Sequence, residues 1–417
     1  MKSSEHPQTP RSLYALFFLL PFGCGDGAEE PAPLDGVLDF MDGLLQEPVY
    51  GPDPTNRLSG LPAAIALGEE LFHDQGLSGN GENACQSCHD PALAFTDGLI
   101  QSEGQGGALT PRASMMLYGT GAQRWLNWDG SCDTAWCQAI GPMEKPGELG
   151  GDRVSLVHHL RDRYADDYAS LGEGGLPDVS GWPSSAKPVP EEPRSPLGLA
   201  WDGLSPAQQA EATHVLVLAA KSISAYLETL EPPEAPFDLV VDRYREVGAE
   251  ALEELPAEAM EGLRLFTGDG ACSSCHFGPL LSNGEFHNIG LGYREWIDDG
   301  DMGRYQGIVS LRENPFNAAG SHSDAPGGEK GRRVAQLAHG MEQLGQYKTP
   351  SLRELLHTAP YMHAGHFGDL DEVIGFYSEL DEAPLHGHRE EMLEPLGWSE
   401  TDIAAVRAFL ELFSSVP

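Results

Sequence analysis

The sequence predicts a mainly α fold made of two similar units in tandem, joined by long irregular loops. Apolar residues recur at helical spacing in several segments, whereas few segments alternate polar and apolar residues as strands do. The 417-residue chain also contains 50 Gly and 32 Pro, which favours loops over sheet. The third observation is an internal repeat: "ALGEELFHDQGLSGNGENACQSCH" and "MEGLRLFTGDGACSSCH" each place a helix and a Gly-rich turn before C-x-x-C-H.

The N-terminus is typical of an export signal. Basic residues precede a short apolar run, which is too short to span a bilayer, so residues 1–24 are predicted to be a signal peptide. The run ends in "PFGCGDG", which resembles a lipoprotein signal with a lipid anchor on Cys24, although Pro21 stands where leucine is usual. Ordinary cleavage nearby is the alternative. In both cases we expect a protein of the periplasm or cell envelope.

The N-terminal unit is predicted to span residues 59–231. Residues 25–58 before it are rich in Pro, Gly and acidic residues and predict a tether. Helical spacing over 61–73 leads into the first C-x-x-C-H motif, and the Gly/Pro-rich stretch 172–204 predicts a surface insertion. A long helix is expected to start at Ser205, with that serine as N-cap and proline at its first position.

The C-terminal unit is predicted to span residues 236–417. It follows "EPPEAP", which ends the long helix and marks the predicted domain boundary. A second helix and motif occupy 257–279, and long loops are expected from there to about residue 345. Helical patterns return at 369–380 and 399–414.

The net charge of −39 excludes some classes of partner. Nucleic acid and anionic lipid both require a basic surface, so neither is expected to bind. A basic protein partner would be steered to such a surface by opposite charge. A solvated acidic surface that only keeps the protein soluble is the alternative.

Two C-x-x-C-H motifs predict two covalently bound c-type haems, one in each unit, and so two cytochrome c-like domains. Two thiols a short turn apart bond the porphyrin, and the adjacent imidazole binds the iron. The residues are Cys85, Cys88 and His89 in the first motif and Cys272, Cys275 and His276 in the second. A structural zinc site is the alternative, but zinc does not require His after the second Cys in both copies, and the pairs lie far apart.

Cys132 and Cys137 are a candidate disulfide in an oxidising compartment. A separation of five residues is awkward for bridging on a regular helix, so a turn would have to intervene.

Several ordered motifs resemble the bacterial di-haem cytochrome c peroxidases. They are "LFHDQGLSGNGENACQSCHDPALAFTDG", "WDGSCDTAWCQAIGPMEKPGELG", "FHNIG" and "YKTPSLRELLHTAPYMHAG". The last block, continued to "LDEVIGFY", is more similar to the MauG-like branch. The resemblance runs from about residue 59 to the C-terminus and leaves out 172–204.

The resemblance implies roles for three residues near the N-terminal haem, where the family reacts with hydrogen peroxide. Trp128 matches a tryptophan that lies between the haems. Gln138 and Glu148 match residues that face the open side of the N-terminal haem. Glu148 is then expected to move a proton between the two oxygens as the O–O bond breaks. Without the resemblance, we would interpret Glu148 as a surface residue and Trp128 as a core aromatic.

The resemblance also implies the axial ligands. Tyr377 stands where the MauG-like branch has a tyrosine ligand on the C-terminal haem and the peroxidases proper have methionine. A tyrosinate stabilises ferric iron and lowers the potential. The loop after the first motif, "DGLIQSEGQGGALTPRAS", has no His or Met, and Gln105 falls where activatable peroxidases have a removable histidine. We therefore expect a five-coordinate N-terminal haem, open to peroxide.

Three departures from the family pattern stand out. Ser131 follows "WDG", where the family has arginine. The family calcium site is matched by Thr358 and Pro360 through backbone carbonyls, but its asparagine is replaced by Ala113, so a calcium ion is predicted with an incomplete ligand set. Ala364 stands where aspartate is common.

Three functions remain open. The first is a MauG-like oxidase that passes the oxidising power of peroxide to a partner protein or donor. The second is a cytochrome c peroxidase that detoxifies peroxide with electrons from a small periplasmic c-type cytochrome or cupredoxin. The third is a non-catalytic di-haem electron carrier, which would need two strong ligands on both irons.

Overall fold

The computed structural model describes residues 35–46, 48, 51–297 and 300–415. The predicted signal peptide, Cys24 and the first part of the predicted tether lie outside them. Within the described part of the chain, no helix is both long and apolar enough to cross a membrane.

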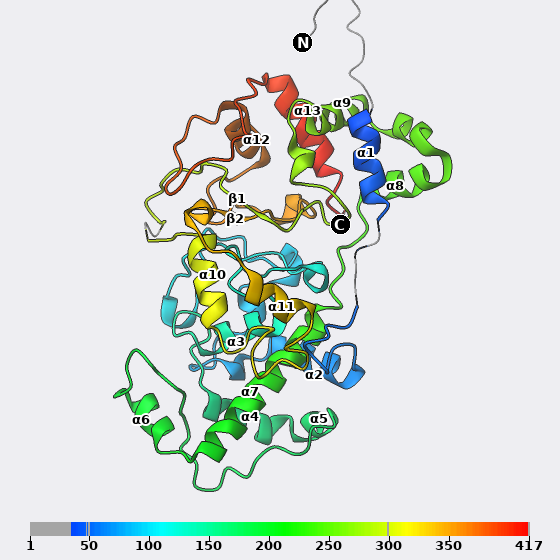
Figure 1. Cartoon of the computed structure of the whole chain (residues 1–417). Coiled ribbons are helices and arrows are strands. Elements are labelled where there is room, and N and C mark those ends of the chain that lie inside the picture. Colours follow the sequence, from blue (N-terminus) through cyan, green and yellow to red (C-terminus); the bar gives the residue numbers. More distant parts are fainter. Residues whose placement is uncertain (1–34, 47, 49–50, 298–299, 416–417) are drawn as a thin grey trace, which may run out of the picture. The chain divides into compact units, whose positions relative to one another are not determined.

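The prediction of a mainly α fold is confirmed (Figure 1). The helices are α1 (Asp35–Leu44), α2 (Pro62–His73), α3 (Ala135–Glu144), α4 (Arg153–Arg163), α5 (Ala165–Ala169), α6 (Pro196–Asp202), α7 (Pro206–Leu227), α8 (Pro236–Val247), α9 (Ala257–Thr267), α10 (Arg304–Glu313), α11 (Glu329–Gln336), α12 (Leu370–Glu379) and α13 (Glu400–Glu411). Two short strands, β1 (Phe286–His287) and β2 (Tyr347–Lys348), pair antiparallel, with His287 opposite Tyr347.

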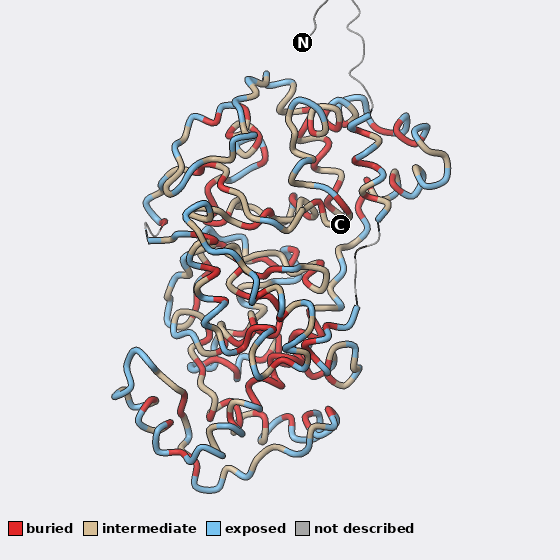
Figure 2. Tube along the Cα trace, viewed as in Figure 1, coloured by how far each residue is buried: buried red, intermediate tan, exposed pale blue. Residues whose placement is uncertain are grey.

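The N-terminal core is built around α7, which packs against α2, α3 and α4. The predicted start of α7 is confirmed: the Ser205 side chain caps the helix, and the Ser205 amide donates a hydrogen bond to Gln208 Oε1 at 2.9 Å. Its last three turns are buried on all sides (Figure 2). A Cβ on Gly68 of α2 would lie 1.9 Å from the Ser222 carbonyl oxygen, so only glycine allows this close helix crossing.

The C-terminal core repeats this construction with α9 and α13. A Cβ on Gly262 of α9 would lie 2.0 Å from the Ala405 carbonyl oxygen. Gly68 and Gly262 each precede, by four residues, the phenylalanine that closes the helix before the haem motif, Phe72 and Phe266. The internal repeat in the sequence therefore corresponds to a repeated helix crossing.

The prediction of a tether over residues 25–58 is wrong for α1. This helix buries Val37, Phe40, Met41 and Leu44, which recur at the spacing of one helical face. Phe40 packs on Phe266 with ring centroids 5.6 Å apart. The wider segment is rich in Pro and acidic residues, so the helical spacing of the apolar residues in α1 was not recognised. Helix α1 belongs to the C-terminal core.

The stretch 172–204 is more than a surface insertion. Trp182, Ala186 and Trp201 join the N-terminal core. The buried Lys187 ammonium donates to the carbonyl oxygens of Glu144 and Gly151, the latter at 2.9 Å. Apolar side chains spaced irregularly along a Pro-rich chain bury area without forming a regular element, so periodicity did not reveal them.

The prediction of continuous loops up to residue 345 is also wrong, because α10 and α11 lie there. This part of the chain packs on the N-terminal core through Phe316. Asp324 pairs with Lys221 at 2.5 Å and with Arg57 at 2.6 Å. The predicted C-terminal unit thus lends a segment to the N-terminal core, while the boundary at 231–236 stays a prediction.

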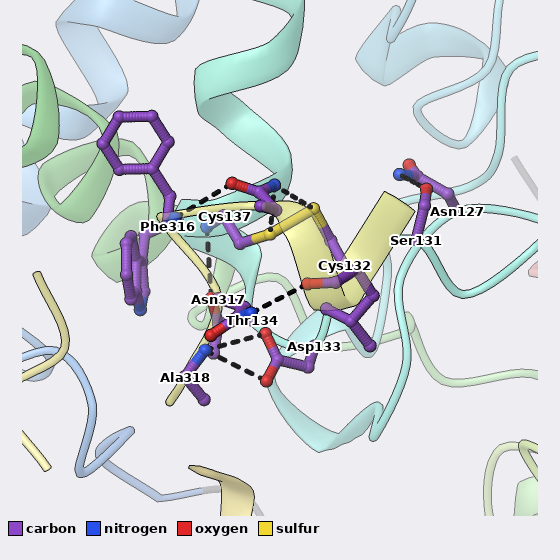
Figure 3. Close-up of a disulfide and its surroundings, with 12 residues drawn as sticks. Asn127, Ser131, Cys132, Asp133, Thr134, Cys137, Phe316, Asn317 and Ala318 are labelled. Atoms are coloured by element: carbon purple, nitrogen blue, oxygen red, sulfur yellow. Dashed lines mark hydrogen bonds between the residues drawn. A yellow bond between two sulfur atoms is a disulfide. The ribbon is translucent and has the colours of Figure 1, made fainter. Parts of the chain in front are cut away.

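Cys132 and Cys137 form a disulfide (Figure 3), with Cα atoms 5.7 Å apart. The required turn is supplied by Thr134, which caps α3 by accepting a hydrogen bond from the Cys137 amide at 3.1 Å. Cys132 therefore lies ahead of the helix. Next to the bridge, the Asp133 carboxylate accepts a hydrogen bond from the Ala318 amide at 3.1 Å.

Candidate haem sites

The two C-x-x-C-H motifs fold alike. Cys85–Ser87 and Cys272–Ser274 each form one 3-10 turn. The His89 amide then donates to the Cys85 carbonyl at 3.1 Å, and the His276 amide donates to that of Cys272 at 2.9 Å. Each turn brings the two cysteines and the following histidine into one short loop.

Both histidine rings are oriented by a backbone carbonyl. The Nδ1 atoms of His89 and His276 lie 2.9 Å from the carbonyl oxygens of Phe95 and Leu281. Phe95 (φ 61°) and Leu281 (φ 51°) are both in the left-handed region. A bond on Nδ1 fixes the tautomer and leaves Nε2 for a metal. Burial lowers the pKa of both imidazoles, that of His276 to about 4, which keeps them neutral as iron ligands must be.

None of the four motif cysteines forms a disulfide with another described residue. Burial raises the pKa of Cys85 and Cys272 to about 12 and that of Cys88 to about 11. Two unbridged cysteines beside an oriented histidine are the groups that covalent haem attachment uses.

A cavity of about 390 Å³ surrounds the second motif, within the size range of cofactor sites. Cys272, Cys275, His276 and Tyr377 all line it. Tyr377 projects from α12, and burial together with the two nearby thiols raises its pKa. The structure therefore brings the predicted ligand into the same cavity as the motif, and the residues present fit a haem.

Glu148 lies near the first motif. Its negative charge raises the pKa of Cys85, Cys88 and His89, although burial is the largest influence on each of these three pKa values. The Lys145 ammonium lies 3.0 Å from the Glu148 carboxylate, whose side chain is 25% exposed. Glu148 is thus both close to the predicted haem and in contact with solvent.

Gln105 lies beside Glu148. Its amide donates to the Glu148 carbonyl at 2.8 Å, and its buried Oε1 has no hydrogen-bond partner among the described residues. Cβ atoms on Gly79 and Gly150 would lie 2.9 and 2.3 Å from that oxygen, so both glycines leave room for this side chain. Gln138 is half-buried on α3, and its amide bonds the Thr134 carbonyl at 3.1 Å.

Trp128 connects the two motif regions. Its indole Nε1 donates to the Ala113 carbonyl at 2.9 Å, and its own carbonyl accepts from the Lys348 amide at 2.7 Å. Trp128 therefore joins the backbone at Ala113 to β2, and it lines the cavity of the second motif.

Thr358, Pro360 and Ala113 line the large cavity together. Among the described residues, no group of three or more His, Cys, Asp or Glu is arranged to hold a metal ion. A calcium ion here would depend on backbone carbonyls and stays a prediction.

Two arginines were not predicted. Arg304 of α10 is buried between the rings of Trp125 (4.7 Å) and Phe286 (4.0 Å) and donates to the Gly130 carbonyl at 2.8 Å. Its guanidinium thus contacts the "WDG" turn that Ser131 follows. Arg112 pairs with Asp129 at 2.8 Å. Arg304 lies outside the quoted motifs. Arg112 lies in the loop "DGLIQSEGQGGALTPRAS", but no role was predicted for it, because its partners Asp129 and Asp301 are distant in sequence.

Comparisons with known proteins identify di-haem peroxidases as similar proteins. The family model described as di-haem cytochrome c peroxidase matches residues 62–188. Cytochrome-c peroxidase IdrP1 of Denitromonas iodatirespirans is 28% identical over 353 residues, covering 84% of this chain and 81% of that protein. Methylamine utilization protein MauG of Paracoccus denitrificans (strain Pd 1222) is 29% identical over 389 residues, covering 85% of this chain and 84% of that protein.

Among solved structures, the diheme peroxidase BthA from Burkholderia thailandensis E264 is similar in fold. The TM-score is 0.60 at 20% identity, and the match covers 88% of this chain and 89% of that protein.

Proposed function

The chain belongs to the di-haem cytochrome c peroxidase family and is a peroxidase-type oxidoreductase, and from this premise we propose a MauG-like activity for it. Cys85, Cys88 and His89 would hold the haem at which hydrogen peroxide reacts. Cys272, Cys275 and His276 would hold a second haem, which together with Trp128 would supply the path for electrons. The reductant is a periplasmic donor or a partner protein that becomes oxidised.

One observation carries the proposal: Tyr377 lines the cavity of the second motif. Oxygen ligation by a tyrosinate favours oxidised iron over easy reduction. This suits a haem that stores oxidising equivalents rather than one that accepts electrons from a cytochrome. The haem supplies the redox chemistry when bound.

Glu148 is proposed to handle the proton. A carboxylate beside the peroxide can accept a proton from one oxygen and return it to the other as their bond breaks. The Lys145 ammonium, 3.0 Å away, orients the Glu148 carboxylate. Because the Glu148 side chain is partly exposed, its carboxylate can exchange protons with water. Gln138 is proposed to orient peroxide on the same face of the N-terminal haem. The loop that carries Gln105 is proposed to cover this face, and it contains no histidine or methionine that could bind the iron.

Trp128 is proposed as the electronic link between the haems. Its indole is hydrogen-bonded on one side and its backbone on the other, which fixes the ring between the two motif regions. Calcium, coordinated by carbonyls of Thr358 and Pro360, would support the same junction. Export to the periplasm or cell envelope, with or without a lipid on Cys24, supplies the oxidising compartment that the Cys132–Cys137 disulfide suits.

The second candidate is a cytochrome c peroxidase fed by a small c-type cytochrome or cupredoxin. It is favoured by Met362 and Met392, which line the same cavity and are alternative ligands to Tyr377. The acidic surface would attract a basic cytochrome.

A single experiment separates these candidates. Hydrogen peroxide is added to the fully oxidised protein, which carries two haems per chain, and both haems are followed by absorption spectroscopy. A long-lived change at both haems without prior reduction is expected. Rapid turnover with reduced cytochrome c, only after reductive activation, would favour the second candidate. If the protein does not react with peroxide in either the oxidised or the reduced state, the remaining function is that of a non-catalytic di-haem electron carrier.

A further inference from the structure

Tyr347 and His363 form a stacked pair beside the large cavity. Their ring centroids are 3.6 Å apart and their planes differ by 10°. Tyr347 is the first residue of β2, and both side chains line the cavity of the second motif. Burial lowers the pKa of His363 well below its usual value, so the stacked imidazole is neutral.

This pair is joined to Trp128. The Ala113 amide donates to the His363 carbonyl at 3.0 Å, and the Ala113 carbonyl accepts the Trp128 indole N–H at 2.9 Å. The Trp128 and His363 rings meet edge to face, with centroids 6.4 Å apart. The Tyr347 ring therefore contacts the His363 ring, which in turn contacts the proposed inter-haem tryptophan, Trp128.

A carboxylate, that of Asp301, lies close to Tyr347. Asp301 and Tyr347 both line a second, smaller cavity of about 20 Å³, large enough for a water molecule. Burial and the Asp301 charge raise the pKa of the phenol, against the opposing charge of Arg112, so Tyr347 keeps its proton at rest.

Arg112 keeps Asp301 ionised, the form that can accept a proton. The Arg112 guanidinium binds both Asp301 oxygens, at 2.7 and 2.8 Å, and reaches Asp129 at 2.8 Å. The bond to Arg112 offsets the burial of Asp301 and leaves its pKa below the usual value. The same guanidinium lies 5.5 Å from the Tyr347 ring centroid. Its charge is balanced by two carboxylates, so it does not prevent oxidation of the ring.

We propose that Tyr347 is a redox-active residue that reversibly holds an oxidising equivalent next to Trp128, with Asp301 as its proton acceptor. The inference rests on the proposed function, because the oxidant is the peroxide-oxidised haem pair acting through Trp128. Tyr347 gives one electron to oxidised Trp128, which is thereby reduced. The phenolic O–H bond breaks, and its proton forms a new O–H bond on Asp301. An electron from the donor, with return of that proton, restores Tyr347.

The chain offers a matched control. Tyr305 of α10 is also half-buried and packs on a histidine ring, that of His339, with centroids 4.2 Å apart and planes tilted by 36°. If contact with a histidine ring alone made a tyrosine oxidisable, both residues would respond to peroxide. The contacts of Tyr347 with His363, Trp128 and Asp301 predict that only Tyr347 does.

The test uses the full-length, two-haem protein, mixed with one equivalent of peroxide and frozen at times from milliseconds to minutes for electron paramagnetic resonance. A tyrosine radical signal near the free-electron g value is expected, and it should narrow when the protein carries ring-deuterated tyrosine. Tyr347→Phe should abolish that signal while haem content and the resting spectrum stay unchanged. Tyr305→Phe should keep it, and Asp301→Asn should reduce it.

A signal that survives in Tyr347→Phe would overturn the proposal, as would the absence of a tyrosine radical in a wild-type protein whose haems peroxide does oxidise. The haem absorption spectrum, recorded on the same samples, separates this failure from failure of the proposed function. In the latter case the haem spectrum itself would not respond to peroxide.

Discussion

The two motif regions share one proximal side and differ on the opposite side. In each region, a glycine-mediated helix crossing leads to a 3-10 turn, two thiols and a histidine held at Nδ1 by a carbonyl 2.9 Å away. Near the first motif lies Glu148, a charged and partly exposed side chain. Facing the second is Tyr377, partly buried and lining a cavity of about 390 Å³.

The difference indicates how one scaffold supports two tasks. Attachment requires the same local groups in both units, so the proximal sides are alike. The opposite sides decide what the iron meets: protons and water near Glu148, or an enclosed phenol at Tyr377. A small substrate suits the first environment, and storage of oxidising equivalents suits the second.

Replacing Glu148 by glutamine should have the largest effect on the difference between the two motif regions. The amide keeps the size of the side chain but cannot take up the proton, so peroxide consumption should slow by about 10²- to 10⁴-fold. Stopped-flow absorption measures the rate, and a haem assay should still count two haems per chain. Glu103→Gln, an exposed change on the neighbouring loop, is the control that should leave the rate unaltered. A normal rate in Glu148→Gln would remove its proposed role.

Tyr377→Phe tests the other side. Losing the oxygen ligand should change the absorption spectrum of the C-terminal haem and raise its potential, on the order of 0.1 V within the ~0.8 V that axial ligands span. Redox titration measures the shift. Tyr361→Phe is the matched control, because Tyr361 lines the same cavity and donates its hydroxyl to the Leu355 carbonyl at 2.7 Å. Identical spectra for wild type and Tyr377→Phe would rule out ligation.

The disulfide is a feature of the first region, and it braces the chain between Trp128 and Gln138. Replacing both Cys132 and Cys137 by serine should lower the free energy of unfolding by about 2 kcal/mol, because the bridge closes only a short loop. Denaturant titration measures this loss. Haem attachment at both motifs should be intact, and loss of the first haem in this variant would show that the bridge does more than stabilise.

Lys348 links the regions and should make stability depend on pH. Burial lowers its pKa from 10.5 to about 7, and its ammonium donates to the Trp125 carbonyl at 3.1 Å. Between about pH 7 and 10 the unfolded chain binds the additional proton. Its contribution to the free energy of unfolding therefore rises with pH through that window and is lost as pH falls to 7.

The measurement for Lys348 is denaturant unfolding at several pH values in wild type and Lys348→Met. The wild-type free energy, relative to the variant, should increase by at most ~1.4 kcal/mol per pH unit. Parallel pH profiles for the two proteins would mean that Lys348 titrates at its ordinary pKa.

Local signals in the sequence were sufficient for several elements. The helices α2, α7, α9, α12 and α13 were predicted from their spacing and caps, because those signals lie within one stretch of chain. Helix α1 had the same kind of signal but was obscured by its Pro- and acid-rich neighbours. In contrast, α10 and α11 gave little signal, because their placement depends on partners distant in sequence: Arg304 of α10 donates to the Gly130 carbonyl, and Lys330 of α11 pairs with Asp53.

The sequence by itself determined the attachment chemistry, since the thiols and the imidazole of a C-x-x-C-H motif are adjacent in the chain and need only one turn to converge. Tertiary structure decided what gathers around those motifs. It placed Tyr377 in the large cavity of the second motif, Arg304 against the "WDG" turn, and Tyr347 close to both His363 and Asp301. The physical reason is distance along the chain: these groups meet only when helices and loops far apart in sequence pack together.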